Sequence, residues 1–341
     1  MTSLKVAVVG AGKVAQNSYL PYLSKEPDVT LGYLSRTPAK AETAAAQFGG
    51  QAFDSPAALM AWAPDTVFIL TREMDRFDAT MAVLEHSPQR LFLEKPLVAR
   101  AGQENVTEQD FFDGRRLMHE AERRGCETAM IFNYRFFDHT LLARRIVAER
   151  DFGQVVSVVG QTHYACWSHC IDLVHHFAGP IAEVSAQAGA AARTAGSTAG
   201  ALTAPDLAAT FRTEAGASGT LLGTAALAWE FPLFELAFNF ERGRVRMQDL
   251  DGDLEIMDSR RQDHERYGIA RHRSRWEQYN ASFRKSIAAY LDSIRQGQPP
   301  PVPGSAGLLE LQVEAGFRRS IAEGRPVRLA EEFPTNMKEE A

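Results

Sequence analysis

Residues 165–176, with the sequence ACWSHCIDLVHH, hold two cysteines, three histidines and one aspartate within twelve positions. Proteins use these side-chain types for proton transfer and for metal coordination. From Ser168 onward, His169, Asp172 and His176 recur at i, i+3 and i+7, which places them along one stripe of a helix. Because an imidazole titrates near neutral pH, this stripe could form the acid–base end of an active site.

Two other interpretations of this segment remain open. Cys166, Cys170 and His169 could together hold a metal ion, although their spacing is not that of a structural zinc motif. The segment could also be a core helix whose histidines border the core without a chemical role. A metal-dependent enzyme and an ordinary core helix are therefore the alternatives to an acid–base site.

A second group of candidate residues follows the short apolar run near the start of the chain. Gly10, Gly12 and Ala15 fit the pattern G-x-G-x-x-G/A. Gly10 permits a tight turn, Gly12 lets the backbone approach a pyrophosphate, and Ala15 lets the next helix pack on the sheet. The helix start at Lys13 and Val14 offers free N–H groups and a positive dipole to the phosphates. The pattern predicts a dinucleotide-binding turn.

The residues that end the second expected strand, 29–35, bear on the choice of cofactor. A fold that selects NAD usually places an acidic residue there, and this chain has Ser35, Arg36 and Thr37 instead. Arg36 can pair with a 2′-phosphate, and the two hydroxyl groups can donate to it. We therefore expect NADP to be preferred. If Arg36 only stacks on the adenine, NAD remains possible.

Alternating strands and helices position these residues. Strand patterns at 65–71 and 90–96, a helical pattern near 108–124 and a further strand from residue 126 predict a doubly wound parallel sheet. Ligands of such sheets lie beyond the carboxyl ends of the strands. We expect the residues at those ends to converge on one crevice: Gly10, Ser35, Thr71, Glu94, Lys95 and Asn133.

The second half of the chain has a different pattern. Strand signals dominate from about residue 155 to 260, which predicts a mostly antiparallel open sheet with covering helices. We expect residues 186–205, poor in large apolar side chains, to be a loop with a weak strand start. The amphipathic helix 276–297 has aromatic residues that we assign to the core rather than to a sugar-binding surface. The expected domains are a Rossmann domain at 1–132, an α+β domain at 133–302, and a helix and tail at 303–341 that return to the first domain.

Composition excludes several classes of protein. The net charge of −6 and the scattered basic residues argue against a nucleic-acid surface. No run of about 18 apolar residues predicts a membrane span, and no secretory signal is recognisable. Three cysteines are too few for a disulfide framework and favour a reducing compartment. We expect a cytoplasmic protein that binds a small molecule.

The order of the motifs resembles a known family. A glycine turn, then FLEKPL, FNYRF and the segment PVPGSAGLLELQVEAGFRRSIAEGRPVRL follow one another as in the glucose–fructose oxidoreductase, inositol dehydrogenase and rhizopine-catabolism family of NAD(P)-dependent oxidoreductases. The resemblance spans nearly the whole chain. It implies hydride transfer between a nicotinamide and a sugar, cyclitol or related polyol or keto compound. It also implies a homodimer or homotetramer formed through the second sheet.

The resemblance implies roles for the residues of FLEKPL. Lys95 would hydrogen-bond the substrate oxygen and stabilise alkoxide character while hydride moves. Glu94 would fix the strand end, and Pro96 would fix the backbone through a cis bond.

The same resemblance gives His169 the proton transfer and Asp172 a supporting role. Family members usually carry D-x-G-x-H-x-x-D here, and the first Asp falls on Ala165 and the Gly on Trp167. Because this carboxylate is missing, a non-catalytic dinucleotide-binding sensor or scaffold is the alternative function. Further candidates for substrate contact or support are Asn133, Tyr164 and His163.

Overall fold

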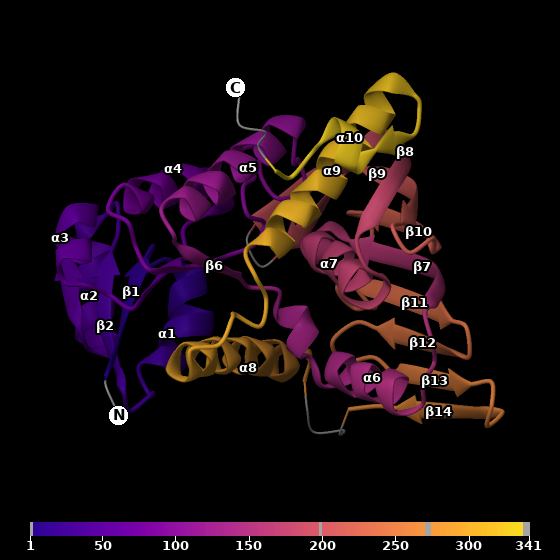
Figure 1. Cartoon of the computed structure of the whole chain (residues 1–341), viewed down its shortest axis with the longest axis horizontal. Coiled ribbons are helices and arrows are strands. Elements are labelled where there is room, and N and C mark those ends of the chain that lie inside the picture. The colour runs from indigo at the N-terminus through magenta and orange to yellow at the C-terminus, as the bar shows by residue number, and fades with distance from the viewer. Residues whose placement is uncertain (1–2, 198–199, 270–273, 337–341) are drawn as a thin grey trace.

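The computed structural model describes residues 3–197, 200–269 and 274–336 of the chain, and it contains two sheets (Figure 1). The first has six strands in the order β3-β2-β1-β4-β5-β6, and every neighbouring pair is parallel. Its strands are β1 (Leu4–Val9), β2 (Val29–Leu34), β3 (Gln51–Phe53), β4 (Thr66–Ile69), β5 (Arg90–Leu93) and β6 (Glu127–Met130). The strand order reverses between β1 and β4, which creates a ligand crevice in folds of this kind. The predicted doubly wound sheet is confirmed.

Helices pack against this sheet. They are α1 (Leu20–Leu23), α2 (Pro38–Phe48), α3 (Pro56–Ala61), α4 (Glu73–Leu84) and α5 (Glu108–Arg123). The helix after the glycine turn begins with a π segment, η1 (Ala15–Tyr19), in which the Leu20 N–H donates to the Ala15 carbonyl. Pro21 cannot donate to the carbonyl of Asn17, so the α-helical ladder is interrupted here.

The second sheet has nine strands in the order β14-β13-β12-β11-β7-β10-β9-β8-β15. Only the β7–β10 pair is parallel, which confirms the mostly antiparallel sheet. The strands are β7 (Val155–His163), β8 (Ile181–Ser197), β9 (Gly200–Thr213), β10 (Ser218–Thr224), β11 (Phe234–Phe240), β12 (Gly243–Gln248), β13 (Leu254–Asp258), β14 (Asp263–Tyr267) and β15 (Val327–Arg328). Helices α6 (Asp138–Glu149) and α7 (Trp167–Ala178) lie on one of its faces.

The expected loop at 186–205 is wrong. β8 and β9 form a long antiparallel hairpin across most of this segment, with a register shift between Ala188 and Ala192. Backbone hydrogen bonds maintain such a ladder even where side chains are small. An ion pair between Arg193 and Asp206 at 3.1 Å and a hydroxyl contact between Thr194 and Thr203 at 2.9 Å add cross-strand support.

Two long helices join the parts of the molecule. α8 (Arg275–Gln296) lies against the first sheet, where the Tyr290 hydroxyl contacts the Thr66 hydroxyl at 2.7 Å. α9 (Ser305–Glu323) contacts α5 and β6 on one side and α7 and β8 on the other (Figure 1). The short η2 (Asn133–Phe136), η3 (Tyr164–Cys166) and α10 (Leu329–Glu332) complete the fold.

The aromatic residues of α8 divide between core and surface. Phe283 and Tyr290 are buried as expected, but Trp276 is 47% exposed, so its assignment to the core is wrong. Within the described residues, no helix is both long and apolar enough to span a membrane.

Candidate active site

The glycine turn connects β1 to the first helix and leaves room for a ligand. Gly10 has φ +100°, and a Cβ there would lie 2.7 Å from the backbone nitrogen of Thr71, so a side chain does not fit. A Cβ on Gly12 would meet no atom within 4 Å, and the following Lys13 and Val14 are exposed. An open glycine beside a helix start fits the pyrophosphate of a dinucleotide.

The end of β2 carries the residues expected to select the cofactor. Arg36 has 85% of its side chain exposed and forms an ion pair of 3.1 Å with Asp75 in the first turn of α4. The Thr37 N–H donates to the Ser35 hydroxyl at 3.4 Å. Sequence reasoning missed Asp75, which brings a carboxylate to a strand end that has none of its own.

The end of β5 is fixed by hydrogen bonds to Glu94. This buried carboxylate accepts from the Tyr19 hydroxyl at 2.7 Å and from the Lys95 N–H at 2.8 Å. Burial and the charge of Glu94 raise the pKa of Tyr19 well above its usual value. The Lys95–Pro96 bond is cis, and Lys95 Nζ donates to Gln103 Oε1 at 2.8 Å.

Arg76 is a residue that sequence reasoning missed. Its guanidinium is buried and donates to the carbonyl of Thr71 at 2.8 Å and to the carbonyl of Pro96. Burial lowers the pKa of Arg76, and the negative charge of Glu94 opposes that shift. Arg76 thus joins the ends of β4 and β5. Its place on the buried face of α4, one turn before Thr80, was the available signal.

His169 is buried beneath an aromatic ring. Its imidazole stacks on Tyr134 with ring centres 3.9 Å apart and an interplanar angle of 9°, and Phe132 meets it edge-on. Burial, with a smaller contribution from the positive charge of Lys95, lowers the pKa of His169 well below its usual value. His169 Nδ1 has no hydrogen-bond partner in the part of the chain that the structure describes. A neutral imidazole near Lys95 can accept a proton.

Asp172 and Asn133 hold elements together. Asp172 is fully buried and accepts two hydrogen bonds from Arg135, at 2.8 and 2.5 Å. Burial raises the pKa of Asp172, and Arg135 opposes that rise. Asn133 Nδ2 donates to the Ser282 hydroxyl of α8 at 2.8 Å. Asp172 therefore anchors η2 to α7, and Asn133 anchors η2 to α8.

Tyr164 and His163 also have structural partners. The Tyr164 hydroxyl donates to the carbonyl of Pro205 on β9 at 2.6 Å. His163 Nδ1 accepts the Ala165 N–H at 3.1 Å and caps the turn at η3. Burial lowers the pKa of His163.

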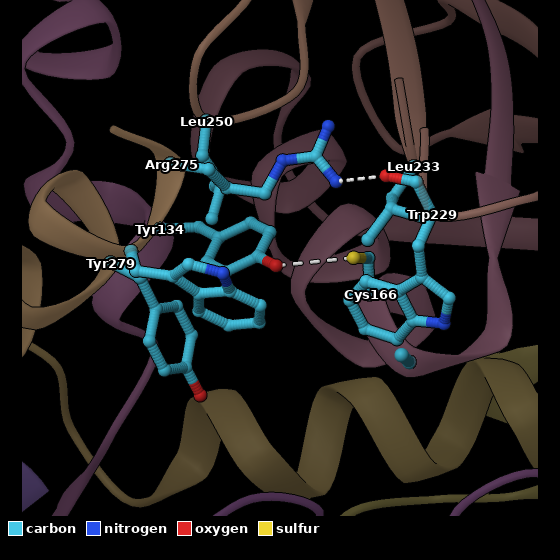
Figure 2. Close-up of a pocket in the computed structure, with 9 residues that line it drawn as sticks. Tyr134, Cys166, Trp229, Leu233, Leu250, Arg275 and Tyr279 are labelled. Atoms are coloured by element: carbon cyan, nitrogen blue, oxygen red, sulfur yellow. Dashed lines mark hydrogen bonds between the residues drawn. The ribbon is translucent and has the colours of Figure 1, made fainter. Parts of the chain in front are cut away.

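A small pocket of about 40 Å³ opens beside this region, between η2, η3 and α8 (Figure 2). Figure 2 shows the Tyr134 hydroxyl donating to Cys166 Sγ, at 3.1 Å, across the pocket wall. Tyr134 thereby connects the pocket to His169, on which its ring stacks. The lining residues, called the aromatic pocket below, are Tyr134, Ala165, Cys166, Trp229, Leu233, Leu250, Arg275, Trp276 and Tyr279.

Arg275 fixes the loop that closes the aromatic pocket. Its guanidinium pairs with Asp249 at 3.1 Å and with Asp251 at 3.2 Å. It also donates to the carbonyl of Trp229 at 2.8 Å. With two carboxylates beside it, Arg275 brings little net charge to the pocket. In the described part of the chain, no group of three or more His, Cys, Asp or Glu residues could hold a metal ion.

The structure thus brings some predicted residues together and separates others. The positive charge of Lys95, just after β5, acts on the buried His169 and helps to lower its pKa. Asp172 and Tyr164 form hydrogen bonds that connect separate elements. Ala165, where the resemblance implies an Asp, lines the aromatic pocket.

Two family descriptions match the chain. "Oxidoreductase family, NAD-binding Rossmann fold" matches residues 4–130, and "Oxidoreductase family, C-terminal alpha/beta domain" matches residues 146–329. The second match alone spans more than half of the 341 residues. A comparison with curated proteins gives no match.

Solved structures show the same fold at low sequence identity. An oxidoreductase from Agrobacterium radiobacter in complex with NAD+, L-tartaric acid and magnesium is 16% identical, with a TM-score of 0.77 and coverage of 97% of this chain and 99% of that one. A putative myo-inositol dehydrogenase from Sinorhizobium meliloti is 18% identical (TM-score 0.72, coverage 96% and 100%). The WlbA dehydrogenase from Bordetella pertussis, in complex with NADH and UDP-GlcNAcA, is 19% identical (TM-score 0.74, coverage 96% and 98%).

Proposed function

The chain belongs to the glucose–fructose oxidoreductase, inositol dehydrogenase and rhizopine-catabolism family of NAD-binding oxidoreductases, and from that premise we propose its reaction. The protein transfers hydride between a nicotinamide dinucleotide and the CH–OH carbon of a sugar, cyclitol or related polyol, or the corresponding keto compound. One observation carries the proposal. Lys95 follows β5 at the carboxyl end of a parallel sheet whose glycine turn is open, and its charge acts on the buried His169.

Each residue has a defined task in this proposal. Lys95 donates a hydrogen bond to the substrate oxygen and stabilises the negative charge that develops there. His169, neutral because it is buried, exchanges the hydroxyl proton. Glu94 and Arg76 hold the strand ends so that Lys95 keeps its position. A bound nicotinamide supplies the hydride acceptor or donor.

We propose NADP as the preferred form of the cofactor and NAD as the alternative. Arg36 supports NADP because its exposed guanidinium can pair with a 2′-phosphate. Asp75 counts against a strong preference, because it brings a negative charge within 3.1 Å of that guanidinium.

The aromatic pocket supports a compact substrate with apolar faces. Trp229 and Trp276 stack with ring centres 6.2 Å apart, and such faces suit the C–H surfaces of a sugar or cyclitol ring. Its volume of about 40 Å³ holds only a few water molecules, so the pocket as it stands is smaller than a sugar ring.

A second candidate function is a dinucleotide sensor or scaffold that binds the cofactor without turnover. The observation that favours it is Ala165, which lines the pocket where the family carries a carboxylate. Loss of an acid–base group typically lowers turnover roughly a hundredfold or more. Binding without turnover distinguishes this candidate from an enzyme.

The test measures nicotinamide absorbance in the purified protein with NADP(H) and NAD(H) against a panel of sugars, cyclitols and their keto forms. Wild type should turn over at least one compound, and Lys95→Ala should lose roughly a hundredfold or more in kcat/KM. Lys40→Ala, on the exposed side of α2, is the matched control and should keep full activity. Undiminished turnover in Lys95→Ala would remove Lys95 from the mechanism. Tight cofactor binding without turnover on the panel would favour the sensor.

We further propose that a second copy of the chain covers the open face of the nine-stranded sheet. This face exposes Val156, Val159 and Leu222, at 49%, 54% and 38%. Arg246 on this face is paired with Glu235 at 3.0 Å, and the exposed valines and leucine are what a partner would bury.

A further inference from the structure

Glu310, in the first half of α9, carries a buried carboxyl group whose role the fold does not explain. Its exposure is 0%, and neither oxygen has a hydrogen-bond partner among the residues that the structure places. Leaving a carboxyl unpaired in the interior is costly, and a group kept under those conditions calls for an explanation.

The packing of α9 brings Glu310 toward the end of β5. A Cβ added to Gly307 would lie 2.9 Å from Met130 Sδ and 3.2 Å from Leu97 Cβ, so glycine lets the helix approach this closely. Leu97 follows Lys95 by two residues. Glu310 is one helical turn beyond Gly307 and therefore projects from the same side of α9.

The charged groups around Glu310 come from three elements. Lys95 stands at the end of β5, Asp172 on α7 and Glu314 on α9 itself. Asp172 is occupied by Arg135, and Arg318 acts on Glu314. Lys95, whose Nζ donates to the neutral Gln103 side chain, is the cation whose charge acts on Glu310.

Burial is the main cause that raises the pKa of Glu310 well above its usual value. Glu314 adds to this rise, and Lys95 opposes it. The carboxyl can therefore hold a proton near neutral pH, and its tendency to do so depends on the charge of Lys95.

We propose that Glu310 holds a proton together with Lys95, and that α9 thereby supplies the carboxyl that Ala165 lacks. The inference rests on the proposed hydride transfer. Glu310 acts through Lys95 and does not touch the substrate, so it is a positioning residue and not a catalytic one.

The pairing of Glu310 with Lys95 would keep the net charge of the site constant during the reaction. Before alcohol oxidation the pair holds one proton and has no net charge. The substrate O–H bond breaks and an N–H bond forms on His169, which then releases a proton to Lys95. The proton that Lys95 held passes to Glu310, while the electron pair of the C–H bond leaves with the hydride. The pair gains one positive charge when the oxidised nicotinamide ring loses one. The net charge of the buried site then stays constant, which avoids the cost of creating charge in a low-dielectric interior.

The proposal is tested without a known substrate by counting protons. Isothermal titration of NAD(P)+ and NAD(P)H into the protein, at pH 7 in two buffers of different ionisation enthalpy, gives the protons exchanged on binding. Wild type should hold about one proton more with the reduced than with the oxidised cofactor. Glu310→Gln, which keeps the shape of the side chain, should lose most of that difference, and Glu310→Asp should restore part of it.

Glu323→Gln is the control, because Glu323 is an exposed carboxyl at the far end of α9. It should keep the proton difference of wild type. An unchanged difference in Glu310→Gln, or an equal loss in Glu323→Gln, would overturn the proposal. Failure of wild type to bind any dinucleotide would overturn the proposed function itself, which is a distinct outcome. With a substrate in hand, the pH profile of kcat should change shape in Glu310→Gln only.

Discussion

In the proposed function, Arg36 and Asp75 together determine how the ribose end of the cofactor is held. A guanidinium pairs with a 2′-phosphate, whereas a carboxylate repels that phosphate and suits a free 2′-hydroxyl. Because their ion pair is largely exposed, little free energy is needed to separate it. Arg36 is therefore available to a phosphate, with Asp75 close enough to weaken the contact.

Replacing Arg36 by alanine is expected to weaken NADPH binding about tenfold and NADH binding less, because only NADPH loses a charge-assisted pair. Asp75→Asn should shift the preference further toward NADPH. The dissociation constants of both cofactors, measured by nicotinamide fluorescence for each variant, check this. Equal losses for the two cofactors in Arg36→Ala would instead show that the arginine stacks on the adenine.

The place of a residue can be predicted when it depends on adjacent residues, and it cannot be predicted when it depends on residues far away in the sequence. The positions of Gly10 and Lys95 could be predicted because each lies within two residues of a strand end. Asp75, Arg76 and Glu310 could not, because their partners lie on other elements and only packing brings them together. The place of Asp172 on a helix was predicted, but its pairing with Arg135 depends on the orientation of η2.

In helix α7, burial changes the pKa of histidine side chains. Burial is the main cause that lowers the pKa of His175 to about 4, and the charge of Arg135 adds to it. In the unfolded chain this imidazole protonates near pH 6.5. The stability that the neutral His175 contributes is therefore complete above about pH 6.5 and is lost as the pH falls toward 4.

Lowering the pH from 7 to 4.5 is expected to reduce the free energy of unfolding through His175 by roughly 2 kcal/mol. His175→Gln, which cannot protonate, should lose less stability over the same interval. Urea unfolding followed by circular dichroism at the two pH values measures this difference. His86→Gln, at an exposed position, is the control, and a pH response in His175→Gln as large as in wild type would contradict the prediction.

The elements also show where sequence patterns stop being informative. The central strands β1, β4 and β5 of the first sheet are short and mostly apolar, so their burial on both faces could be predicted. The β8–β9 hairpin has small and polar side chains over much of its length, and its backbone ladder leaves no such pattern. The aromatic pocket, built from five separate segments of the chain, could not be predicted either, because only packing brings them together.

For the whole molecule, the open face of the second sheet predicts self-association. Val159→Glu combined with Leu222→Glu places two charges on that face, and the protein should become monomeric in light scattering coupled to size exclusion. Leu141→Glu, a half-exposed apolar position on α6, is the control and should leave the assembly unchanged. A monomeric wild type would show that the face has another role.

The position of α8 has a consequence for the order in which the protein forms. Phe68 and Phe92 of the first sheet lie against Tyr290, with ring centres 5.7 and 4.8 Å away. These contacts join residues about two hundred positions apart, so the ribosome delivers Tyr290 long after Phe68 and Phe92. Until then, one face of the dinucleotide-binding sheet remains bare. This sheet thus completes its core only after α8 has been made, and before that the nascent chain carries an exposed aromatic surface.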